Sequence, residues 1–168
     1  ESERFLEATA LANNMAFRSM LTQGLFTFTS KLADLLNADR ASLFVLDGDE
    51  LVLTVTEDLE DLGHVVVPIG TGIAGTVAMT GVTIRIDDAY SDSRFNQEVD
   101  KQTGYQTKSI LCLPIKNRDG DVFAVAQLLN RRDEQPFDAR DERRFQSFIE
   151  SIGVILETQL GLGEQFDD

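Results

Sequence analysis

The sequence predicts an α+β protein in which long helices pack on a largely antiparallel sheet of about six strands. The hydrophobic period is helical at both ends of the chain and strand-like between them. Two Asp-Gly turns, Asp47-Gly48 and Asp119-Gly120, join consecutive strands as hairpins. Because hairpins pair neighbouring strands in opposite directions, the sheet is expected to be antiparallel. The length of 168 residues fits one such domain.

The first helix is expected over residues 3–37, where apolar residues recur at three- and four-residue steps. Gly24 is a weak point at which this helix could kink or divide in two. The helix is longer than one small sheet can cover, so part of its apolar stripe is expected to meet a second copy of the chain.

The central part of the chain reads as strands with one short helix. The expected strands are 41–47, 51–57, 64–69, 82–86, 109–116 and 122–130. The short helix covers Ile73 to Thr80 and ends at Gly81. Residues 87–107 are polar and without a clear period, which is typical of loops that contact ligands. A last helix begins at Asp138 and has an apolar face.

The charge and the cysteine content narrow the class of function. The net charge of -14 disfavours nucleic acids and anionic membrane surfaces as partners, although one small anion could still bind to local amide groups. No apolar run reaches the ~18 residues of a membrane span. Cys112 stands alone in an apolar run, so we expect a core thiol in a reducing, cytoplasmic compartment.

Gly70 to Gly75, "GTGIAG", matches the dinucleotide fingerprint on paper. The context that this motif requires is missing, because the following helix is short and the hairpin-rich remainder offers no run of βαβ units. A flexible turn before a helix is the favoured interpretation. A third interpretation is that the amides of Ile73 and Ala74, at the helix N-terminus, hold one phosphate.

Catalytic and metal sites find little support in the sequence. His64 is the only histidine, and it begins a strand with no nucleophile nearby in a suitable turn. One His and one Cys cannot form a zinc site, and neither acidic stretch has the glycine spacing of a calcium loop. We expect no catalytic residue, no metal and no resident cofactor.

The stretch from Asn130 to Glu142 contains charges of both signs around Phe137. Asp138 suits a helix N-cap, and acidic side chains three residues later suit the helix dipole. Helix capping does not account for Arg131. An ion pair from Arg131 to Asp141, covered by Phe137, would attach the last helix to the sheet edge.

The positions Asn130, Arg131, Phe137, Asp141 and Glu142 resemble the Asn-Lys-Phe-Asp-Glu signature of cyclic-nucleotide-binding GAF domains, found in phosphodiesterases and cyanobacterial adenylate cyclases. Arg replaces Lys here, and the two are not interchangeable at a buried site. We call these five residues the clasp. Four further stretches resemble GAF segments in order: "ASLFVLDGDEL", "IGTGIAGTVAMTG", the segment 87–117 and "VFAVAQLLN". The resemblance implies a GAF domain over residues 20–160, after a dimerisation helix over 1–19 and before a tail, 161–168, that leads to a further domain.

The resemblance also implies where a ligand would lie, between the sheet and a lid formed by the long loop. Backbone amides of Ile73 and Ala74 would hold the cyclic phosphate, and the backbone of Phe95 and Asn96 would close over it. Ribose and base contacts would come from Asp100, Thr103, Thr107, Ser42, Thr56, Glu57 and Gln127. The lid has no cysteine, and this disfavours a covalently attached bilin chromophore.

Two positions bear on which nucleotide is preferred. Thr56 stands where some relatives place an aromatic residue, and Gln127 stands where some guanine binders have Glu. A carboxamide both donates and accepts hydrogen bonds, as the adenine edge requires, so cAMP is favoured over cGMP. The function expected from the resemblance is cyclic-nucleotide regulation of a linked adenylate cyclase or phosphodiesterase, within a parallel homodimer joined by the end helices. A nucleotide-free dimerisation spacer and a sensor of another small molecule are the alternatives.

Overall fold

A computed structural model describes residues 2–55 and 65–164 of the chain. The strands are β1 (Ala38–Asp47), β2 (Glu50–Val55), β3 (Val66–Pro68), β4 (Ile84–Ile86), β5 (Ile110–Lys116) and β6 (Val122–Arg131). The helices are α1 (Ser2–Leu35), α2 (Gly72–Thr80), the 3-10 helix η2 (Ala89–Ser91), α3 (Glu98–Thr103) and α4 (Ala139–Glu164). The α+β prediction is confirmed.

The described strands form one six-stranded sheet in the order β3-β2-β1-β6-β5-β4. Every neighbouring pair is antiparallel, as the Asp-Gly hairpins predict. The two central strands, β1 and β6, are far apart in the sequence and pair along most of their length. Helices pack on both faces of these two strands.

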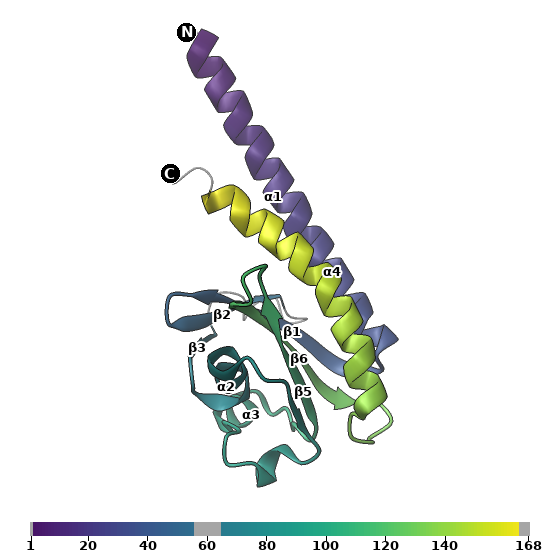
Figure 1. Ribbon diagram of the computed structural model, residues 1–168. Coiled ribbons are helices and arrows are strands. Elements are labelled where there is room, and N and C mark those ends of the chain that lie inside the picture. Colours follow the sequence, from purple (N-terminus) through teal and green to yellow (C-terminus); the bar gives the residue numbers. More distant parts are fainter. Residues whose placement is uncertain (1, 56–64, 165–168) are drawn as a thin grey trace.

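Alternate residues of the central strands face opposite layers, because the side-chain period of a strand is two. Leu43, Ala126 and Leu128 join the core under α1 and α4. Phe44 and Val125 join a second core, under α2. Figure 1 shows the same division, with the two long helices on one side of the sheet and the short helices on the other.

Two predictions about individual elements need correction. Helix α1 is continuous from Ser2 to Leu35 and passes through Gly24 without a break, so of the two outcomes considered at Gly24 the division does not occur. The segment 87–107, expected to lack regular structure, contains both η2 and α3. Gly81 ends α2 in the left-handed conformation, with φ of 68°, as predicted.

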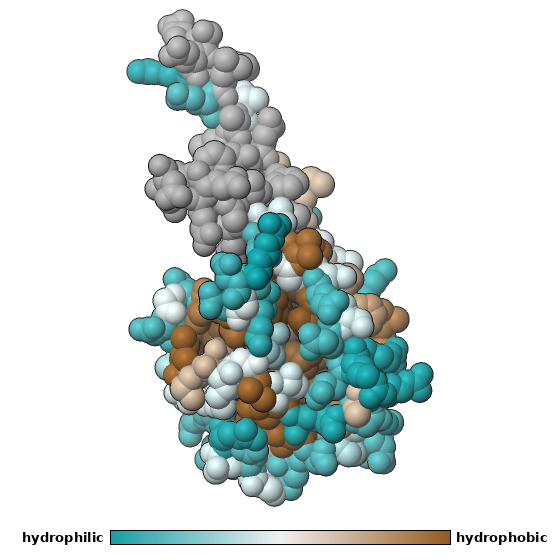
Figure 2. All heavy atoms as spheres, viewed as in Figure 1, coloured by the Kyte–Doolittle hydropathy of each residue, from teal (hydrophilic) through white to brown (hydrophobic). Residues whose placement is uncertain are grey.

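The N-terminal part of α1 extends away from the sheet, and α4 runs beside its C-terminal part (Figure 1). Helix α1 packs into the core through Phe28, Leu32 and Ala33, and Leu36 joins the same core directly after the helix ends. None of the helices in the described ranges is long and apolar enough to cross a membrane. On the face drawn in Figure 2, hydrophobic side chains show between hydrophilic ones over the globular part.

Candidate ligand-binding site

A cavity of about 220 Å³ lies between the sheet and the short helices. Strands β1, β2, β3 and β6 border it, together with the N-terminus of α2 and the segment that carries α3. The sequence-predicted residues that line it are Ser42, Ile73, Ala74, Phe95, Asn96, Asp100, Thr107 and Gln127. Of the described positions, Thr103 is exposed and does not line the cavity; its hydroxyl donates to the Val99 carbonyl at 2.8 Å. Thr56 and Glu57 lie outside the described residues, as does His64.

The floor of the cavity follows from strand alternation. Arg40, Ser42 and Phe44 are alternate residues of β1 and all line the cavity. Gln127 pairs with Ser42 across the β1–β6 ladder. Within the described part of the chain, neither side chain of this Ser42–Gln127 pair makes a hydrogen bond, so both are available to a ligand.

The wall at one end is the N-terminus of α2, where Ile73 and Ala74 are buried. In the described chain the preceding Thr71 makes no side-chain capping bond, and the first amides of a helix have no partner within the helix. Such amides, together with the helix dipole, attract an anion. The cavity therefore has a polar end suited to a single negative charge.

The glycines of "GTGIAG" shape the turn into α2 and the packing of α2 against the preceding strand. Gly70 and Gly72 adopt positive φ angles, of 87° and 68°, that bend the chain into α2. Gly75 lies against the preceding strand, since a Cβ atom there would approach the Pro68 carbonyl oxygen to 2.5 Å. The Gly70 amide donates to the Gly75 carbonyl at 2.8 Å, which closes the turn.

The lid is held together by Asp100, a buried carboxylate at 7% exposure. It accepts hydrogen bonds from the Tyr90 hydroxyl at 2.7 Å and from the Thr107 amide and hydroxyl at 2.7 and 2.8 Å. The hydrogen bond to Asp100 raises the pKa of Tyr90. These bonds join η2, α3 and the segment that precedes β5 into one unit. Phe95 packs edge-on against Tyr90, with ring centroids 5.4 Å apart.

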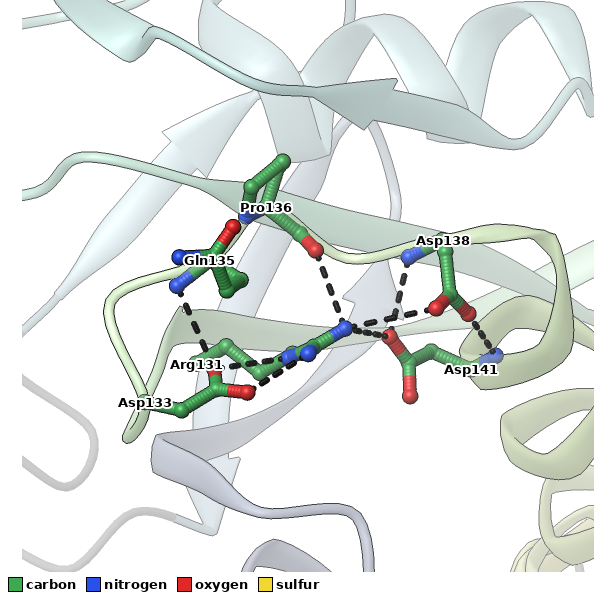
Figure 3. Close-up of polar contacts among 6 residues, drawn as sticks. All are labelled: Arg131, Asp133, Gln135, Pro136, Asp138 and Asp141. Carbon is green, nitrogen blue, oxygen red and sulfur yellow. Dashed lines mark hydrogen bonds and ion pairs between the residues drawn. The ribbon is translucent and has the colours of Figure 1, made fainter.

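The clasp forms around Arg131 (Figure 3). Its Nη1 lies 3.1 Å from Asp141 Oδ2, so the predicted ion pair is present with Arg in place of Lys. Nη1 also donates to the Pro136 carbonyl at 3.2 Å, and the other two nitrogens hold Asp133 in a fork at 2.8 and 2.6 Å. Phe137 is buried at 2% exposure, in the core that α1 and α4 share with the sheet.

Helix α4 begins with the predicted reciprocal cap. Asp138 Oδ1 accepts from the Asp141 amide, and Asp141 Oδ2 accepts from the Asp138 amide, both at 2.9 Å. The clasp and the helix cap thus share the Asp141 carboxylate. Glu142 does not join them; its carboxylate lies 3.8 Å from Arg85 of β4.

Asn130 connects the clasp to the lid. It adopts a positive φ of 56°, which Asn tolerates better than most residues. Its Oδ1 accepts from the amides of Lys108 and Ser109 at 2.6 and 3.1 Å. Its Nδ2 donates to the Gln106 carbonyl at 2.9 Å and to the Tyr105 hydroxyl at 3.1 Å. The strand end is therefore fixed to the chain that leaves the lid.

Sequence reasoning missed several residues of the cavity. Arg40, Phe44 and Leu129 follow from Ser42 and Gln127 by strand alternation, and that signal was present in the sequence. No comparable sequence pattern indicated that Val65, Val66 and Val67 line the cavity. Cys112 is buried in the core, as expected, and burial raises the pKa of its thiol.

Comparisons with known proteins identify the family. The sequence profile of the GAF domain family matches residues 20–156. The chain is 42% identical over 137 residues to the dual 3′,5′-cyclic-AMP and -GMP phosphodiesterase 11 of Drosophila melanogaster, a match that covers 71% of this chain. It is 37% identical over 169 residues to the dual phosphodiesterase 11A of Takifugu rubripes, covering 93% of this chain. The matches span only 9% and 18% of the length of these two relatives.

Solved structures agree on the fold. The GAF domain of a phosphoenolpyruvate-protein phosphotransferase from Coxiella burnetii superposes with a TM-score of 0.77, at 20% identity, over 94% of this chain and 96% of that one. The corresponding domain from Acinetobacter gives a TM-score of 0.74 at 19% identity, over 95% and 98% of the two chains. With six antiparallel strands, the long C-terminal helix and the profile match in agreement, the chain belongs to the GAF domain family, and it is related to the GAF domains of cyclic-nucleotide phosphodiesterases.

Proposed function

We propose that the cavity binds a 3′,5′-cyclic nucleotide and that the domain regulates a linked cyclase or phosphodiesterase in the cytoplasm. The observation that carries the proposal is the pairing of an anion-attracting helix end with two unbonded polar side chains in one cavity. The anion-attracting helix end consists of the Ile73 and Ala74 amides, and the two unbonded polar side chains are those of Ser42 and Gln127. A cyclic nucleotide has one negative charge and a polar base edge, and both features have complements here.

The relatives support this ligand class. Their names describe enzymes that act on cyclic AMP and cyclic GMP, and the chain matches a part of each. The cavity volume of about 220 Å³ is below the roughly 300–1,000 Å³ of typical ligand pockets. We propose that the lid around α3 adjusts when the ligand binds and closes over it. Thr103 remains a candidate contact in that closed state, as do Thr56 and Glu57, which lie outside the described residues.

We propose cAMP as the preferred nucleotide. Gln127 lines the cavity beside Ser42, and its amide offers a donor and an acceptor to the adenine edge. A Gln127→Glu variant offers acceptors only, which suit the N1–H and N2–H donors of guanine. The ratio of cGMP to cAMP affinity should rise in this variant, by roughly tenfold if one hydrogen bond decides it.

We also propose a parallel homodimer through the end helices. The exposed Met15 and Met20 on the extended part of α1, with exposed Val154 on α4, supply apolar surface for such contacts. Movement of α4 on ligand binding would then pass to an output domain. Sedimentation at tens of micromolar should show a dimer, and a clean monomer would contradict the proposed homodimer.

Isothermal titration calorimetry with cAMP, cGMP and linear 5′-AMP tests the ligand. We expect a Kd below roughly 100 μM, about -5.5 kcal/mol, for at least one cyclic nucleotide and weaker binding of 5′-AMP. Gln127→Leu should weaken binding, whereas Gln146→Leu, at an exposed position of α4 outside the described cavity, is the matched control. Failure of both cyclic nucleotides to bind contradicts the proposal and leaves a dimerisation spacer or another ligand.

A further inference from the structure

Arg40 borders the cavity and has an aromatic residue behind it. Its guanidinium carbon lies 3.9 Å from the ring centroid of Tyr105. Tyr105 is absent from the described residues that line the cavity, whereas Arg40 is among them. One side of the guanidinium is thus covered by the ring, and the Arg40 side chain separates that ring from the cavity. Within the described residues, Arg40 forms no ion pair with a carboxylate.

The Tyr105 hydroxyl is fixed by two hydrogen bonds. Its hydroxyl donates to Asp39 Oδ2 at 2.7 Å and accepts from Asn130 Nδ2 at 3.1 Å. Burial, followed by the hydrogen bond to Asp39, raises the pKa of Tyr105, so the hydroxyl stays protonated and keeps its donor. Asn130 is a clasp residue, and Tyr105 therefore joins the clasp to the cavity floor.

The position of Arg40 along the floor matters for what it can contact. The Phe44–Val125 pair lies in the core under α2, and the Arg40–Leu129 pair lies four residues away along β1. At ~3.3 Å per residue this separation is roughly 13 Å. A phosphate held by the Ile73 and Ala74 amides would lie at the α2 end of the cavity, and the base of the same molecule would then extend over Ser42 toward Arg40.

We propose that Tyr105 is a positioning residue that holds the Arg40 guanidinium as a flat surface on which the base of the bound nucleotide stacks. This inference rests on the proposed function. A guanidinium plane stacks on aromatic faces, whereas the ammonium of Lys is a compact, strongly hydrated charge. Bases stack on Arg planes in other nucleotide complexes, and such stacking tolerates every base. The aromatic residue missing at Thr56 would be replaced in this way by Arg40 and Tyr105.

An electrostatic role for Arg40 is the competing explanation. In that case any cation would serve, and the effect would act on the phosphate instead of the base. Arg40→Lys separates the two roles because it keeps the charge and loses the plane. Ribose 3′,5′-cyclic phosphate, which has no base, is a second test of the two roles, because it can respond to the charge of Arg40 but cannot stack on its plane.

The experiment measures the affinity of cAMP, cGMP and the base-free cyclic phosphate for the whole chain by calorimetry, or by ligand-observed NMR where binding is weak. We expect Arg40→Ala and Arg40→Lys each to weaken both cyclic nucleotides roughly tenfold. The base-free ligand should change less than threefold with Arg40→Lys. Tyr105→Leu should resemble Arg40→Ala, and Tyr105→Phe, which keeps the ring, should recover most of the affinity.

Arg118→Ala, at an exposed arginine outside the cavity, is the matched control, and melting temperatures identify variants that fail to fold. Unchanged nucleotide affinity in Arg40→Lys and Arg40→Ala overturns the inference while wild-type binding upholds the proposed function. If Arg40→Lys loses equal affinity for the nucleotides and for the base-free ligand, the inference is also overturned. A wild-type chain that binds neither cyclic nucleotide overturns both.

Discussion

At the scale of single residues, the planar side chain of Arg131 does more than replace the charge of a lysine. Its fork on Asp133 uses two nitrogens, and the third remains for Asp141 and the Pro136 carbonyl (Figure 3). An ammonium cannot hold both carboxylates with this geometry. The ion pair with Asp141 was predicted from the spacing, whereas the fork on Asp133 depends on a turn whose shape the sequence does not reveal.

The Asp133 carboxylate should give the protein a distinct response to acid. The hydrogen bond from Arg131 lowers the pKa of Asp133 from 3.8 to about 2. Because the folded pKa lies below the unfolded one, this group stabilises the fold above about pH 4, and the contribution is lost as the pH falls to about 2. In Asp133→Asn, the free energy of unfolding should therefore fall less steeply between pH 4 and pH 2 than in the wild type. Urea unfolding across this range measures the slope, and equal slopes contradict the prediction.

Asp141 belongs to both the clasp and the cap of α4, and it should therefore matter more than its neighbour Glu142. Asp141→Ala removes the Arg131 ion pair and one capping bond, which should cost about 2 kcal/mol of unfolding free energy. The nucleotide affinity should weaken as well, through the loosened connection of helix and sheet. Thermal unfolding and calorimetry test both effects.

Glu142→Ala is the matched control for this substitution. Its carboxylate lies 3.8 Å from Arg85 with both side chains partly exposed, so it should cost less than about 1 kcal/mol. Should Asp141→Ala leave stability and binding unchanged, the clasp has no architectural role.

At the scale of elements, the close packing of α2 against β3 depends on a glycine. A Cβ at Gly75 meets the Pro68 carbonyl oxygen at 2.5 Å, so Gly75→Ala must push α2 away from β3. We expect a loss of roughly 1–3 kcal/mol and weaker anion binding, since the Ile73 and Ala74 amides move with the helix. Gly24→Ala is the opposite case, because nothing lies within 4 Å of its added Cβ. It should stabilise the chain by roughly 0.5–1 kcal/mol.

The elements differ in how well the sequence predicted them. Strong strands and the capped helices were found near their true bounds, because their signals are local. Helix α3 was missed because its polar sequence has no apolar period; Asp100 is bonded there to Tyr90 and Thr107, which lie outside the helix. The contact of Arg40 with Tyr105, 65 residues further along the chain, likewise depends on tertiary structure.

At the scale of the whole molecule, the sheet separates two functions. One face carries α1 and α4, and the other carries the cavity and its lid (Figure 1). The clasp lies where the two layers meet, because Asn130 holds the lid and Asp141 begins α4. A ligand that moves the lid can therefore act on the long helices through Asn130 and Arg131.

The central claim is that the cavity takes a cyclic nucleotide with its phosphate on the first amides of α2. Backbone amide NMR during titration with cAMP or cGMP tests it most directly. The account predicts that the Ile73 and Ala74 amide signals shift strongly and saturate together with those of α3, while the Asn117–Asp121 hairpin stays unchanged. Saturable binding that leaves Ile73 and Ala74 unshifted, or no shift at all at millimolar nucleotide, would contradict it.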